Sequence, residues 1–159
     1  MDNKTYPVTL IAKYLLMKSK EDSKPITQLK LQKILYYAQG WYLANFNKPL
    51  FNEKIKAWKF GPAVDEIYQN YKVYGNQPIT MEIENEELSA LDSDTKDFLD
   101  EIWKVYKPYS GGDLVTSTHL EDPWNEARRD IEEGENSDNE ISKESIKEFF
   151  KKKLNGRSN

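Results

Sequence analysis

Apolar residues recur at helical spacing from the start of the chain. The first such segment begins after Pro7, a residue that suits the first turn of a helix. A polar stretch over residues 18–25 interrupts it, and Thr27 then offers a side-chain oxygen as the N-cap of a second helix. The first stripe consists of Val8, Ile11, Ala12, Leu15 and Leu16.

The second helical segment, residues 28–46, is apolar on two sides. At about 100° per residue, one face holds Leu31, Ile34, Leu35, Ala38, Trp41 and Tyr42, and the nearly opposite face holds Leu29, Tyr36 and Leu43. A helix that is apolar on two sides is buried between other elements. We therefore predict that this helix forms the centre of the core. Gly40 costs about 1 kcal/mol in a helix interior relative to alanine, so we expect it to allow the close approach of a neighbouring backbone.

The pattern changes over residues 51–71. Phe51, Ile55 and Ala57 alternate with polar residues, which predicts a short extended segment or a small hairpin. Gly61-Pro62 is expected to form a turn and to start a third helix. The apolar stripe of this helix is Val64, Ile67, Tyr68 and Tyr71.

The second half of the chain predicts further helices. An acidic stretch after residue 81 reads as a solvated connector or small helix, and a fourth helix is expected over about residues 94–106. Ser110 is a suitable cap for a short helix, Pro123 starts another, and Ser142 caps the last. The inward residues of the fourth helix are expected to be Phe98, Leu99, Ile102, Val105 and Tyr106.

Together these elements predict one mainly α fold: a single compact domain of six or seven helices around a central buried helix, with a short hairpin as its candidate β element. We expect residues 1–130 to form the helical domain proper. Residues 131–159 are expected to form an acidic loop and an amphipathic C-terminal helix. That helix carries Phe149 and Phe150, which we expect to dock on the same domain because an exposed pair of phenylalanines favours aggregation.

Composition limits the possible chemistry. The 159 residues include no cysteine, which excludes disulfides and thiolate sites and suits a cytoplasmic protein. No apolar run approaches the roughly 18 residues that span a bilayer, and the first residues lack the pattern of a signal peptide. We therefore expect no membrane partner and a cytoplasmic location.

Charge is distributed unevenly along the chain. Residues 1–80 carry a net charge of +6 and residues 81–159 a net charge of −10, within a total of −4. The acidic second half argues against tight duplex DNA binding, although the basic first half leaves a local basic patch open.

Motifs for catalysis are not found. His119 is the single histidine, and no serine stands in a nucleophile-elbow pattern beside it. One histidine without cysteine makes a poor zinc site, and neither a P-loop nor a dinucleotide-binding glycine pattern occurs. We therefore predict no catalytic, metal-binding or cofactor-binding residues, no cofactor and no enzymatic activity.

Three motifs together indicate a family. They are Leu31-Gln32-Lys33 with Tyr36-Tyr37, then Trp58 before Gly61-Pro62, then Thr118-His119 before Asp122-Pro123-Trp124. In this combination and order the chain resembles, over about residues 8–129, the Panacea domain. This family is also called SocA-like and includes phage-associated GepA-like proteins.

The resemblance implies an antitoxin of a toxin–antitoxin pair. Members bind a cognate toxin directly and neutralise it, and some resemble adaptors that hand a toxin to a protease. A toxin encoded by an adjacent gene is the expected partner, and the oligomeric state is left open. A core does not require the polar motif residues Gln32, Lys33, Gln39 and His119, so we expect them in a shared groove or a buried hydrogen-bond network. Asp122 is a further polar residue of the motif.

Aromatic and basic residues mix in one part of the first half, near the charge boundary. On the antitoxin hypothesis, such a surface suits a protein partner because interfaces combine aromatic anchors with a polar rim. The predicted partner-binding residues are Lys33, Tyr37, Trp41, Lys59 and Phe60. The alternatives are the final helix as the binding surface and two other functions. One is a phage-encoded regulator or host inhibitor whose acidic half mimics nucleic acid; the other is an enzyme with an unrecognised carboxylate pair.

Overall fold

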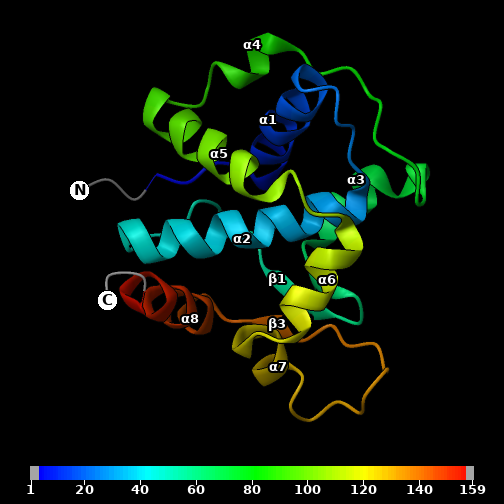
Figure 1. Ribbon diagram of the computed structural model, residues 1–159, viewed down its shortest axis with the longest axis vertical. Coiled ribbons are helices and arrows are strands. Elements are labelled where there is room, and N and C mark those ends of the chain that lie inside the picture. Colours follow the sequence, from blue (N-terminus) through cyan, green and yellow to red (C-terminus); the bar gives the residue numbers. More distant parts are fainter. Residues whose placement is uncertain (1–3, 157–159) are drawn as a thin grey trace.

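The helix α2 (Gln28–Phe46) runs through the middle of the molecule (Figure 1). This computed structural model describes residues 4–156. On one side of α2 lie α1 (Val8–Glu21) and α5 (Ser93–Tyr106), and on the other lies α8 (Lys143–Gly156). Leu35 and Tyr36 are 0% and 1% exposed. The prediction of a central buried helix with two apolar faces is therefore confirmed, except that Leu29, near the start of the second face, is 38% exposed.

Local signals set both ends of α2. The Thr27 hydroxyl accepts a hydrogen bond from the Lys30 backbone N–H at 3.2 Å, as predicted for an N-cap. The helix ends at Asn47, which adopts a left-handed conformation with φ of +62°. Asparagine tolerates this conformation better than most residues.

The remaining helices are short. Together with α1, α2, α5 and α8 they confirm the predicted mainly α fold. Between α2 and α5 lie α3 (Asp65–Tyr71), the 3₁₀ helix η1 (Lys72–Tyr74) and α4 (Asn85–Leu88), and after α5 come α6 (Gly111–His119) and α7 (Asp122–Ala127). In the capping box of α6, Ser110 Oγ accepts from the Asp113 N–H and Asp113 Oδ2 accepts from the Ser110 N–H.

A small antiparallel sheet joins distant segments. Its strand order is β2-β1-β3, with β1 at Ile55–Trp58, β2 at Gly61–Ala63 and β3 at Glu140–Ile141. The predicted hairpin is present, with Trp58 opposite Gly61 and the residue pair 59–60 at its tip. The prediction that Gly61-Pro62 starts a helix is wrong, because these residues form β2 and the helix begins at Asp65. β3 was not predicted.

The inward face predicted for α5 needs one correction. Val105 is 52% exposed, whereas Trp103 is only 2% exposed. The indole Nε1 of Trp103 donates to Asp22 Oδ2 at 2.7 Å, just after the end of α1. Because Trp103 fills the contact with α1, Val105 is turned toward solvent.

Gly40 allows a close approach, but not the one predicted. The neighbour is the side chain of Phe150 on α8 rather than a backbone. Phe150 is fully buried, and its ring centroid lies 5.0 Å from that of Trp41 and 5.6 Å from that of Tyr36, both in edge-on geometry. The aromatic residues of α2 and α8 thus form one cluster.

No helix within residues 4–156 combines the length and apolar character needed to cross a membrane.

Candidate partner-binding groove

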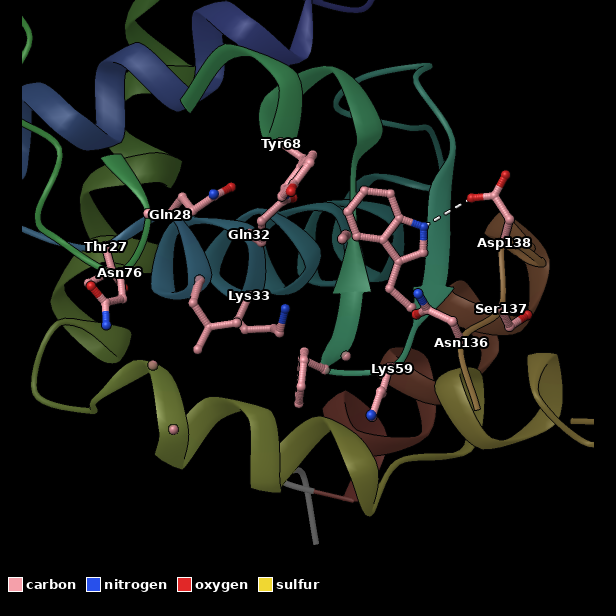
Figure 2. A pocket seen from close by; sticks show the side chains of 18 residues that line it. Thr27, Gln28, Gln32, Lys33, Lys59, Tyr68, Asn76, Asn136, Ser137 and Asp138 are labelled. Atoms are coloured by element: carbon pink, nitrogen blue, oxygen red, sulfur yellow. Dashed lines mark hydrogen bonds between the residues drawn. The ribbon is translucent and has the colours of Figure 1, made fainter. Parts of the chain in front are cut away.

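A groove of about 1110 Å³ opens beside the first turns of α2. The β1–β2 hairpin, the start of α6 and the segment 136–138 contribute its other walls. In Figure 2, Thr27, Gln28 and Asn76 lie at one end, and Asn136, Ser137 and Asp138 lie at the other. Lys33, Tyr68 and Lys59 lie between these ends. Tyr68 of α3 and residues 75–76 also line it, so the groove combines residues from six separate parts of the chain.

Exposed apolar side chains line this groove. Leu29 is 38% exposed, Tyr68 is 39% exposed and Phe60, at the hairpin tip, is 62% exposed. Trp58 packs edge-on against Tyr68 with ring centroids 5.4 Å apart. Large apolar side chains left in contact with solvent along a concave surface are typical of a binding site.

Lys33 lies at the inner side of the groove and is almost completely buried, with 2% of its surface exposed. Its Nζ donates to the Pro62 carbonyl oxygen at 3.0 Å. Burial lowers the pKa of Lys33 to about 7, because the charged ammonium loses its hydration. The inner wall of the groove therefore contains a buried lysine whose position is fixed by a hydrogen bond to the hairpin.

Gly61 makes room for Lys33. Its φ of +109° is unfavourable for residues with a side chain, and a Cβ at this position would lie 2.6 Å from Lys33 Cε and 2.9 Å from Thr118 Oγ1. The motif residues Lys33, Gly61 and Thr118 therefore meet at one point, although they are far apart in the sequence.

Gln32 and Gln39 hold the backbone on either side of the hairpin. Gln32 Nε2 donates to Val64 O at 3.0 Å, and its Oε1 accepts from Val64 N at 2.8 Å. Gln39 Nε2 donates to Phe51 O at 2.8 Å, and its Oε1 accepts from the N–H groups of Leu50 at 2.8 Å and Phe51 at 3.3 Å. The two glutamines are seven residues apart, or about two helical turns, so they point to the same side of α2. They form buried hydrogen bonds to main-chain groups, one of the two arrangements expected for them.

His119 adjoins the tip of the hairpin, where it interacts with the backbone of Lys59. Its ring stacks on Trp124 with centroids 3.9 Å apart and an interplanar angle of 12°. Its Nε2 is buried, and among the described residues it has no hydrogen-bond partner. Burial, and next the charge of Lys33, lower its pKa below the usual value. Asp122, a further polar residue of the motif, is exposed at the first position of α7, where a carboxylate interacts favourably with the helix dipole.

The sequence did not single out Glu121. This residue is 4% exposed and accepts hydrogen bonds from the hydroxyls of Tyr36 at 3.0 Å and Tyr37 at 2.9 Å. Burial raises its pKa, while the tyrosine hydrogen bonds act in the opposite direction. The partners are more than 80 residues apart, so no local pattern could have revealed them.

The five predicted partner-binding residues do not form one surface. Tyr37 and Trp41 are 2% and 7% exposed, and Lys33 is buried as described. Tyr37 stacks on Tyr106 with centroids 4.4 Å apart, and Trp41 Nε1 donates to the Tyr106 hydroxyl at 2.8 Å. The physical reason is that α5 and α8 enclose α2. Lys59 and Phe60 alone are exposed at the rim of the groove, and their role in partner binding stays a prediction.

Within the part of the chain that the structure describes, no group of three or more histidine, cysteine, aspartate or glutamate residues is placed to hold a metal ion. The described groove instead offers apolar walls, side-chain amides and lysines.

Comparison with known proteins gives the same family as the motifs. The model of the family described as antitoxin SocA-like, Panacea domain, matches residues 31–125. Antitoxin SocA of Caulobacter vibrioides (strain NA1000 / CB15N) is 30% identical over 133 residues, which cover 77% of this chain and 71% of that protein. No solved structure matches. The matched region contains most of α2, the hairpin and α6, whereas the groove residues 27–29 and 136–138 lie outside it. The chain belongs to the SocA-like Panacea-domain antitoxin family.

Proposed function

We propose that this protein neutralises a cognate protein toxin by binding it directly in the cytoplasm. Membership of the antitoxin family supports a toxin as the partner. The observation that supports direct binding is the groove, where the side chains of Leu29, Phe60 and Tyr68 expose apolar surface beside Lys59. Protein interfaces draw most of their affinity from a few such anchors.

Binding without catalysis is the form of neutralisation that these features support. His119 is stacked on Trp124 and adjoins the backbone of Lys59, and its buried Nε2 has no hydrogen-bond partner among the described residues. Glu121 is held by Tyr36 and Tyr37 inside the core. Both residues therefore support the fold that presents the groove.

The test is co-expression with the product of an adjacent gene. The gene product is expressed alone and together with this protein in the same bacterial strain, and growth, toxin level and co-purification are measured. We expect the toxin alone to stop growth, and the pair to restore growth and to elute as one complex from a size-exclusion column.

One outcome would contradict direct binding, and a second would show that the toxin is removed by a protease rather than held inactive by binding alone. If growth is rescued while the toxin level is unchanged and no complex forms, the protein acts on the cellular target of the toxin and not on the toxin itself. Rescue with a lowered toxin level, reversed by deleting a protease, would indicate an adaptor instead. A toxin expressed from an unrelated promoter with a foreign ribosome-binding site controls for effects on its gene or message.

A further inference from the structure

Two lysines line the groove, Lys33 and Lys59, and no acidic side chain among the described residues pairs with either of them. Lys33 Nζ donates to one acceptor among the described residues, the neutral Pro62 carbonyl, although an ammonium has three N–H donors. In the described part of the chain neither Lys33 nor Lys59 has an ion pair with an acidic side chain. Lys59 lies near the ring of Phe60, with Nζ 5.5 Å from the centroid.

The acidic side chain that lines the groove is already engaged. Asp138 Oδ1 accepts from Trp58 Nε1 at 3.0 Å, and its Oδ2 pairs with Lys56 Nζ at 3.2 Å. These two partners hold the pKa of Asp138 below its usual value. The Asp138 carboxylate is therefore oriented toward the hairpin (Figure 2) and does not pair with Lys33 or Lys59, for which no other acidic partner occurs within residues 4–156.

Burial makes an anionic ligand favourable here. Desolvating a charged lysine is costly unless an opposite charge or further hydrogen bonds compensate. Lys33 is 2% exposed but lines the groove, so an anion in the groove would interact with it in a low-dielectric environment. The apolar surfaces of Leu29, Phe60 and Tyr68 beside it favour a ligand that is also apolar.

We propose that this groove binds an acidic segment of the toxin, which places an apolar side chain against Leu29, Phe60 and Tyr68 and a carboxylate toward Lys33 and Lys59. The inference rests on the proposed function, because it names the part of the toxin that the antitoxin recognises. Side-chain amides at both ends of the groove, from Gln28 and Asn136, are placed to bind the main chain of such a segment.

The first experiment measures the affinity of the purified antitoxin for the toxin by calorimetry. Lys59→Glu and Phe60→Ala are each expected to weaken binding by about tenfold or more, as for residues that anchor an interface. Lys152→Glu reverses an exposed lysine of α8, and Phe46→Ala removes a ring that is 51% exposed at the far end of α2. These matched controls should bind within about twofold of the unmodified protein, with thermal unfolding checked for every variant.

The second experiment identifies the segment. Hydrogen exchange of the toxin, alone and in the complex, should show protection of a segment that contains Asp or Glu beside an apolar residue. Replacing that acidic residue by Lys should weaken binding to the unmodified antitoxin and restore binding to Lys59→Glu. Such a charge exchange shows direct pairing, which a change in stability would not produce.

The outcomes separate the two proposals. If the unmodified protein forms no complex with the toxin, the proposed function fails and this inference falls with it. If a complex forms but both groove variants bind like the controls, only this inference fails. It also fails if mass spectrometry shows a small organic acid bound to the protein and the affinity for the toxin is the same for the groove variants and the unmodified protein.

Discussion

The ring of Phe150 on α8 occupies the space that a side chain at residue 40 of α2 would need. A Cβ on Gly40 would lie 2.3 Å from two ring atoms of Phe150, much closer than atoms can pack. Gly40→Ala should therefore lower the free energy of unfolding. Overpacking a core costs about 1–3 kcal/mol, which outweighs the gain in helix propensity of about 1 kcal/mol. Urea unfolding followed by circular dichroism measures the change.

A double-mutant cycle isolates this contact. In a Phe150→Ala background the clash is gone, so Gly40→Ala should become neutral or stabilising by up to about 1 kcal/mol. Phe150→Ala alone should cost about 3–5 kcal/mol, because the ring is fully buried. Stabilisation by Gly40→Ala in both backgrounds would show that Phe150 does not require the glycine.

The sequence was sufficient where local rules decide the structure. The Thr27 cap, the Ser110 cap and the two apolar faces of α2 depend on residues within a few positions of each other, and each was predicted correctly. The inward position of Val105 was wrong, since a distant partner, Asp22, draws Trp103 into the contact instead. Helical spacing defines a face only to within about one neighbouring position.

The groove shows the limits of sequence reasoning more clearly. The motif marked Gln32, Lys33, Gly61 and His119 as belonging together, and the structure places Gly61 against Lys33 and gives Gln32 a partner at Val64. The burial of Lys33 could not be predicted, because lysines are almost never fully buried. Its burial depends on the absence of a side chain at Gly61, a contact across 28 positions that no periodicity encodes.

Gln39 makes a testable contribution to the fold. Gln39→Ala would leave the buried N–H groups of Leu50 and Phe51 and the Phe51 carbonyl without their present partner. Each buried polar group left unsatisfied costs about 1–3 kcal/mol, so we expect a loss of at least about 2 kcal/mol in urea unfolding. Gln69→Ala, at an exposed position of α3, serves as the control and should change stability by less than about 0.5 kcal/mol. Equal effects of the two substitutions would contradict a special role of Gln39.

His119 should matter for stability and not for chemistry. His119→Ala removes the stack on Trp124, and stacked aromatic pairs contribute about 0.5–1.5 kcal/mol beyond the area they bury. A lower melting temperature is expected, with toxin neutralisation retained in a growth assay well below that temperature. Loss of neutralisation in a variant that melts like the unmodified protein would instead assign His119 a direct functional role.

Lys33 should make stability depend on pH. Its pKa is lowered from 10.5 to about 7 in the folded protein, so between these values the unfolded chain binds more protons than the folded one. The contribution of Lys33 to the free energy of unfolding therefore rises as the pH increases from about 7 to 10.5. Below pH 7 the lysine is charged in both states, so the full cost of burying the charge is present. The slope is at most about 1.4 kcal/mol per pH unit.

The comparison with Lys33→Met isolates this effect, since methionine keeps much of the apolar stem and cannot be charged. The difference in free energy of unfolding, unmodified protein minus Lys33→Met, should increase between about pH 7 and pH 9.5. Tyr36 and Tyr37, whose pKa values are raised by burial, are present in both proteins and cancel. Lys152→Met removes the same charge from an exposed site and corrects for net charge. A difference that stays constant over this range, after that correction, would show that Lys33 is charged in the folded protein throughout, and that the Pro62 carbonyl and its surroundings compensate its burial.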